Sequence, residues 1–132
     1  MKNRAYKNYI FDFYGTLVDI LTDEKDPVLW DTLGQLYQAY GADYEGDALK
    51  KAYAKHVDQA RKELIELKGV AYPEIDLAYI FNQLYADARP QSSNSNQLDD
   101  WGQLIAMVFR VLSRKHLTAY PHTKEVLAFL KE

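Results

Sequence analysis

Residues near the amino end of the chain combine a carboxylate with a strand-like apolar run. Residues 9–11 are Tyr, Ile and Phe, and the run stops at Asp12. Such a run is typical of a short strand buried in a parallel sheet. Asp12 would then lie at the carboxyl end of a strand, where α/β proteins hold ligands and reacting groups. A carboxylate held there is a candidate nucleophile.

The residues that follow Asp12 predict a tight turn. Gly15 has a backbone that adopts positive φ without a steric penalty, and Thr16 adds a hydroxyl that can bond nearby backbone or carboxylate groups. Together they would hold the carboxylate of Asp12 in place for covalent catalysis. The alternative is that residues 9–17 are only a buried strand and a β-turn with a helix-capping aspartate.

Residues 9–19 resemble the first motif of the haloacid dehalogenase (HAD) superfamily, an apolar strand ending in Asp-x-Asp-x-Thr-Leu or a close variant. The residues at that family's spacing are Asp12, Gly15, Thr16, Leu17 and Asp19. Tyr14 stands where most HAD phosphatases carry a second aspartate. The resulting Asp-x-Tyr-Gly-Thr-Leu form is similar to the subgroup that contains the 2-haloacid dehalogenases.

The resemblance implies a hydrolase in which Asp12 attacks phosphorus, or carbon in a dehalogenase, to form an aspartyl ester that water hydrolyses. Tyr14 and Thr16 are the other implied catalytic residues. A phenol with a pKa of about 10 donates a hydrogen bond but is a weak base near neutral pH, so Tyr14 suits a halide leaving group better. The implied cofactor is Mg²⁺, bound by the Asp12 carboxylate and the Tyr14 backbone carbonyl.

Two features limit this resemblance. In the dehalogenases an arginine follows a tryptophan of the first helix and holds the substrate carboxylate, whereas Asp31 follows Trp30 here. The later HAD motifs, a serine or threonine, a lysine and an acidic pair, have no counterpart in these 132 residues. A lone carboxylate binds Mg²⁺ weakly, so the metal site is incomplete. We expect this chain by itself to have little or no activity, because the charge of a transferred phosphoryl group would be nearly uncompensated.

The fold that we expect is mainly α, the helical cap plus the first strand of a HAD-like α/β (Rossmann-like) fold. The first core strand and nucleophile loop would occupy residues 1–20, and the helical cap residues 21–118. A helix at residues 119–132 would return the chain to a core that these residues do not contain. A single core strand exposes backbone donors and acceptors on both edges. Either it pairs with another chain, giving a homo-oligomer, or it abandons the strand form, or further polypeptide completes the core.

The helices are predicted from the periodicity of apolar residues and from the prolines and glycines that begin or end them. An aspartate cap at Asp26 and Pro27 begin the first helix, Gly41 ends it, and Gly69 ends the second. The predicted helices span residues 27–40, 46–68, 73–88, from about 98 onward, and 120–132. Residues 89–97 are polar, small and without periodicity, so they predict a mobile loop.

Composition excludes several classes of protein. A net charge of -3 and a pI of about 5.6 offer no basic face for nucleic acid. No apolar run approaches a membrane span, and the basic amino end is too short for a signal peptide, so we expect a cytoplasmic protein. The chain has no cysteine, and its histidines, His56, His116 and His122, lack the spacing of a metal site.

Three interpretations remain open from the sequence. The first is a HAD-type hydrolase, or part of one, that acts in its complete form on a small phosphorylated or halogenated metabolite. The second is a non-catalytic HAD remnant that serves as a binding or oligomerising module. The third is an unrelated four-helix bundle, which predicts helix rather than strand at residues 9–13.

Overall fold

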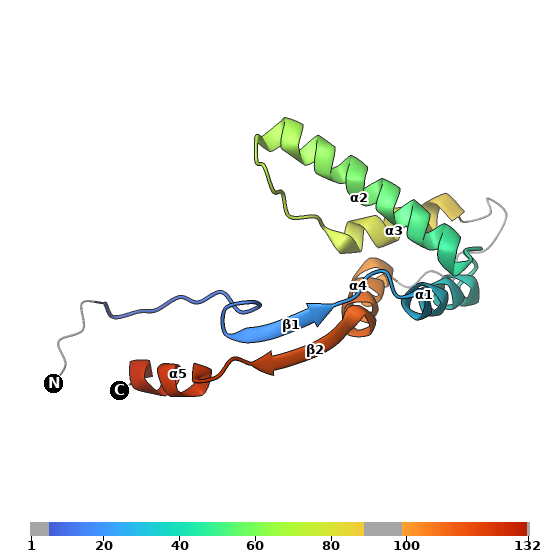
Figure 1. Ribbon diagram of the computed structural model, residues 1–132. Helices are drawn as coiled ribbons and strands as arrows, with labels where there is room; N and C mark the ends of the chain where they lie inside the picture. Colours follow the sequence, from blue (N-terminus) through green and yellow to red (C-terminus); the bar gives the residue numbers. More distant parts are fainter. Residues whose placement is uncertain (1–5, 89–98, 132) are drawn as a thin grey trace. The chain divides into compact units, whose positions relative to one another are not determined.

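The computed structural model describes residues 6–88 and 99–131. These residues are mostly helical and contain one two-stranded sheet (Figure 1), which confirms the predicted mainly α class. The elements in chain order are β1 (Val18–Thr22), α1 (Pro27–Ala39), α2 (Gly46–Lys68), α3 (Leu77–Ala88), α4 (Trp101–Ser113), β2 (Arg114–Ala119) and α5 (Thr123–Lys131).

The chain divides into two compact units. The helical unit, Glu24–Ser113, contains α1 to α4. The hairpin unit is built from the two flanking segments, Met1–Asp23 and Arg114–Glu132, which contribute β1, β2 and α5. One unit is therefore a continuous insertion between the two halves of the other. The boundaries predicted from sequence are 20/21 and 118/119, whereas these two units divide at 23/24 and 113/114.

The ends of α1 and α2 follow the predicted signals. A side-chain oxygen of Asp26 accepts a hydrogen bond from the backbone N–H of Val28 at 2.9 Å, and Pro27 is the first helical residue. Beyond the helices, Gly41 has φ 89° and Gly69 has φ 62°. Glycine adopts this left-handed conformation at little cost, so both helices end there.

The start of α3 differs from the prediction. The helix begins at Leu77 rather than at Pro73. Asp76 determines this start, because its carboxylate accepts the backbone N–H of Tyr79 at 3.2 Å and its carbonyl accepts that of Ile80 at 3.2 Å. The capping hydrogen bond to Asp76 therefore sets the start of α3, and Pro73 does not.

Two further helix starts also fall later than predicted. The helix expected from about residue 98 begins at Trp101, and the helix expected from residue 120 begins at Thr123. The predicted mobile loop, residues 89–97, lies outside the described residues. None of the helices in residues 6–88 and 99–131 is long and apolar enough to cross a bilayer.

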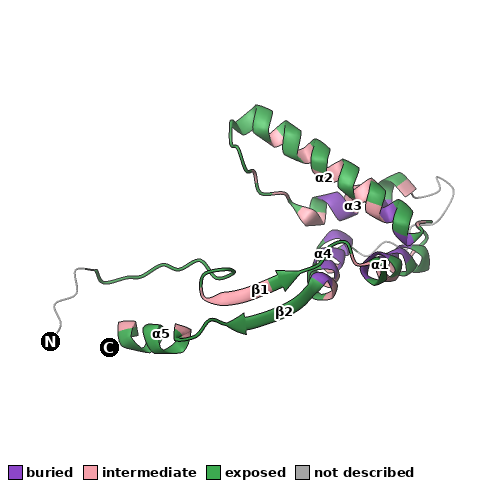
Figure 2. Cartoon of the chain, in the orientation of Figure 1, coloured by how far each residue is buried: buried purple, intermediate pink, exposed green. Residues whose placement is uncertain are grey.

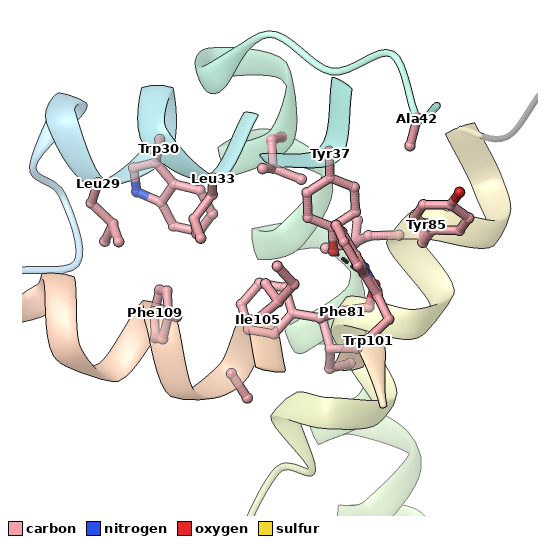
Figure 3. Packing of buried hydrophobic residues seen from close by; sticks show 14 residues of the cluster. Leu29, Trp30, Leu33, Tyr37, Ala42, Phe81, Tyr85, Trp101, Ile105 and Phe109 are labelled. Atoms are coloured by element: carbon pink, nitrogen blue, oxygen red, sulfur yellow. Dashed lines mark hydrogen bonds between the residues drawn. The ribbon is translucent and has the colours of Figure 1, made fainter. Parts of the chain in front are cut away.

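The buried residues form one aromatic-rich core in the helical unit (Figure 3). Trp30 of α1 lies against Tyr53 of α2 and Phe109 of α4, with ring centroids 5.1 and 5.8 Å apart. The buried hydroxyl of Tyr37 donates to the carbonyl of Phe81 in α3 at 2.7 Å. The core residues are Leu29, Trp30, Leu33, Tyr37, Ala42, Leu49, Ile80, Phe81, Leu84, Tyr85, Trp101, Ile105, Ala106 and Phe109.

The hairpin unit is held by an antiparallel ladder between β1 and β2. Val18 pairs with Ala119 and Ile20 with Leu117, and a shift in register follows Leu21. Neither strand was predicted: residues 18–20 were assigned to the nucleophile loop, and residues 114–118 to the cap. Each strand is short, and its partner lies more than ninety residues away along the chain, so local periodicity does not indicate the pairing.

The predicted buried strand at residues 9–11 is wrong. These residues form no strand, and the side chain of Ile10 is 98% exposed. No described residue of the hairpin unit is buried, as the absence of purple on β1, β2 and α5 in Figure 2 shows. A strand needs a neighbour to pair its backbone donors and acceptors. No neighbour for residues 9–11 is present in the described part of the chain, and these residues do not take the strand form there.

Candidate functional site

A tight turn follows Asp12 and is closed by backbone hydrogen bonds. The carbonyl of Phe13 accepts the N–H groups of Thr16, Leu17 and Val18 at 3.3, 2.9 and 3.2 Å. In the opposite direction, the N–H of Gly15 donates to the carbonyl of Val18 at 2.8 Å. Gly15 has φ 74°, which confirms the predicted use of positive φ at this position. We call residues 13–18 the candidate turn.

Asp12, Tyr14 and Thr16 lie in or beside this turn and are exposed. One carboxylate oxygen of Asp12, Oδ1, accepts the N–H of Phe13 at 2.8 Å. The ring of Tyr14 lies edge-on to that of Phe13, with centroids 5.1 Å apart. Within the described residues, the side chains of Asp12, Tyr14 and Thr16 form no hydrogen bond to one another. The turn therefore brings them close along the chain without joining them into a network.

The geometry at Asp12 differs from that of a carboxylate at the end of a buried strand. Its fixed oxygen is held by a neighbouring backbone N–H, and the other oxygen, Oδ2, has no hydrogen-bond partner in the described part of the chain. A carboxylate with one anchored and one open oxygen can attack an electrophile. The burial that would position a substrate against it does not come from residues 6–23 or 114–131, none of which is buried.

The described residues do not by themselves provide a complete Mg²⁺ site at Asp12. No group of three or more His, Cys, Asp or Glu side chains in residues 6–88 and 99–131 is placed to hold a metal ion. Asp12 supplies one carboxylate, and one of its oxygens, Oδ1, already accepts the N–H of Phe13. Mg²⁺ requires near-octahedral oxygen ligands. The ligands predicted by resemblance, Asp12 and the Tyr14 carbonyl, are too few.

The three histidines have carboxylate neighbours that sequence analysis did not identify. His56 of α2 lies 2.7 Å from Asp87 of α3, measured from Nε2 to Oδ2. On the hairpin, His116 lies 3.4 Å from Asp19 across the strands. His122 contacts Glu125 in the next turn of chain at 2.8 Å, and this three-residue spacing was the one available signal. The other two pairs depend on tertiary structure.

Asp31, which follows Trp30 in α1, lies close to the start of α2. Gly46 at the start of α2 is so near Asp31 that an added Cβ would lie 2.8 Å from the Asp31 backbone nitrogen. The carboxylate of Asp31 therefore lies beside the amino end of α2, where the helix dipole favours negative charge. A polar pocket of about 360 Å³ opens here, lined by Asp31, Gly34, Gln35, Gln38, Tyr44, Glu45 and Gly46. Its acidic lining does not suit an anionic substrate.

Comparisons with protein-family models, with curated proteins and with solved structures find no match for this chain.

Proposed function

We propose that the chain carries the nucleophile turn and the helical cap of a HAD-like hydrolase, in which Asp12 attacks a small phosphorylated or halogenated metabolite. The proposal rests on the sequence at residues 12–19, which resembles the first HAD motif. The observation that best supports it is the closed turn after Asp12, with Gly15 at φ 74° and three N–H groups donated to Phe13. The predicted strand at residues 9–11 would also have supported this proposal, but it is not formed.

A second observation is consistent with this proposal. The helical unit is inserted in the sequence between β1, which follows the candidate turn, and β2, which pairs with β1. In the proposed hydrolase the helical unit corresponds to the cap, and the candidate turn corresponds to the nucleophile loop that supplies the reacting carboxylate.

The proposed chemistry assigns a separate task to each of three residues. Asp12 Oδ2 would form a bond to phosphorus or carbon while the leaving group departs with its bonding electrons, and water would then hydrolyse the ester. Tyr14 would donate a hydrogen bond. Thr16 would support the turn through its backbone N–H, as it already does. The remaining charge compensation, including any Mg²⁺, must come from groups outside this set.

The gene provides the first test. A reading frame that continues after codon 132 into a strand ending in Ser or Thr, with a later lysine and an acidic pair, supports the hydrolase. A stop codon at that point contradicts it and favours the non-catalytic alternative.

A kinetic test follows if the frame continues. In the full-length protein, Asp12→Asn should abolish turnover of p-nitrophenyl phosphate or of 2-chloropropionate, and the substrate that is turned over decides between phosphatase and dehalogenase chemistry. Asp23→Asn is the matched control, because it neutralises an exposed carboxylate of the same unit that lies outside the motif. Unchanged turnover in Asp12→Asn would exclude Asp12 as the nucleophile.

The second candidate function is a non-catalytic module that self-associates. It is favoured by the exposure of apolar side chains in the hairpin unit, where Ile10 is 98%, Tyr6 71% and Leu21 59% exposed. Exposed apolar side chains such as these can be covered by a partner if they form one contiguous surface. Pairing of residues 9–13 with the same residues of a second copy would satisfy their backbone groups and form a homo-oligomer.

A further inference from the structure

The carbonyl of Leu17, near the end of the candidate turn, accepts hydrogen bonds from a distant part of the chain. It accepts a hydrogen bond from the backbone N–H of Tyr120 at 3.2 Å. It also accepts one from the hydroxyl Oγ1 of Thr123 at 2.9 Å, across 106 residues of sequence. A carbonyl oxygen has two lone pairs, and both are directed to the segment that follows β2.

The hydroxyl of Thr123 bonds outside its own helix. Thr123 is the first residue of α5, one position after the N-cap, which is where a threonine hydroxyl commonly bonds a backbone N–H of its helix. Here the hydroxyl proton is donated away from the helix, to Leu17. Thr123 is half-buried, whereas most of its neighbours are exposed. The side chain therefore acts between segments and not within α5.

The candidate turn has few other attachments. Its internal hydrogen bonds join Phe13, Gly15 and Val18 to one another, so they make the turn rigid without fixing its position. That position depends on the pairing of Val18 with Ala119 and on the two bonds to the Leu17 carbonyl. Because the turn adjoins Asp12, whatever holds Leu17 also limits where that carboxylate can lie.

We propose that Thr123 is a positioning residue that holds the candidate turn, and with it Asp12, through the Leu17 carbonyl. That Thr123 positions a nucleophile rests on the proposed function. That Thr123 holds the candidate turn does not depend on it. Residues 120–123, which follow β2, are thereby bonded to the candidate turn, which precedes the helical unit in the sequence. Loss of the hydroxyl would leave the Leu17 carbonyl with the N–H of Tyr120 alone and loosen the turn.

The test is amide hydrogen exchange, measured by NMR on the 132-residue chain. Thr123→Val keeps the shape of the side chain and removes its hydroxyl. Exchange at Gly15, Leu17 and Val18 should become about five- to tenfold faster, as expected for one net hydrogen bond. The carbonyl ¹³C shift of Leu17 should move in the direction of a weaker hydrogen bond. Thr123→Ser restores the hydroxyl and should return both values to those of the original chain.

The control is Thr118→Val, which removes a hydroxyl from β2 without touching the Leu17 bond and should leave the turn unchanged. Equal exchange in Thr123→Val and the original chain would overturn the proposal, as would failure of Thr123→Ser to rescue. If Thr123→Val unfolds the hairpin unit, the test is the carbonyl ¹³C shift of Leu17 in Thr123→Ser. A shift equal to that of the original chain supports the hydrogen bond, and a changed shift contradicts it. The two proposals can fail separately. If Thr123→Val speeds amide exchange in the candidate turn while Asp12→Asn keeps its turnover, the proposed hydrolase mechanism is refuted. The role of Thr123 in holding the turn would still stand.

Discussion

The side chain of Asn82 in α3 accepts a hydrogen bond from the backbone N–H of Gly102 in α4, at 2.9 Å between Oδ1 and N. The bond satisfies one of the first N–H groups of α4, which have no partner inside their own helix. It is possible because Gly102 has no side chain. A Cβ at this position would lie 2.6 Å from the Asn82 amide nitrogen and would also meet the backbone carbonyl of Ala78.

Gly102→Ala should therefore destabilise the helical unit by about 2–3 kcal/mol, because α3 and α4 would have to separate and lose the Asn82 bond. The measurement is urea unfolding followed by circular dichroism at 222 nm. Gln103→Ala is the control, since that residue is exposed on the same helix and should change stability by less than about 0.5 kcal/mol. Equal stability of the two variants would show that the close approach of these helices is not required.

His122 occupies a backbone conformation that favours glycine, with φ 67°. Its ring contacts Glu125, an exposed pair that contributes little to stability. We expect His122→Gly to be more stable than His122→Ala by about 1 kcal/mol, because both lose the ring contact and only glycine removes the strain. Exchange of the Val126 amide, which bonds the His122 carbonyl at 2.9 Å, reports the difference. Faster exchange in the glycine variant would contradict the expectation.

Alkaline pH should destabilise the helical unit. Burial raises the pKa of Tyr53 to about 12, and burial also raises the pKa of Tyr37. An unfolded chain ionises its tyrosines near pH 10, so it loses these protons before the folded chain does. The stabilisation is therefore fully present below about pH 10 and is lost as pH rises through 12. Urea unfolding at a series of pH values measures this loss.

The variant that tests the assignment is Tyr53→Phe, which should reduce the alkaline loss of stability. Tyr72→Phe is the control, because the Tyr72 side chain is 94% exposed. A loss of stability between pH 10 and 12 that is the same in both variants would exclude Tyr53 as a contributor.

Self-association should depend on residues 9–13. If they pair with a second copy, the chain should elute as a species larger than a monomer in size-exclusion chromatography with light scattering. Ile10→Lys should weaken this association about tenfold or more, since it removes an apolar contact and introduces like charges. Val28→Lys is the control, because Val28 is also exposed, at 68%, but lies on α1. A compact monomer at all concentrations would refute the oligomer.

The sequence by itself determined the helical class and the bounds of α1 and α2. Each of those ends depends on local chemistry: an Asp26 side chain that caps a nearby N–H, a proline at the first helical position, and glycines that take positive φ. Local sequence also predicted the conformation of Gly15. These features need no partner from elsewhere in the chain, so a short window contains all the information.

Tertiary structure alone decided the rest. The β1–β2 ladder and the bond from Thr123 to Leu17 join segments about a hundred residues apart, and neither strand has a periodicity strong enough to indicate its partner. Residues 9–11 have the composition of a buried strand, yet they remain exposed. Strand formation is a property of a pair of segments, because the backbone groups of one strand are satisfied only by another.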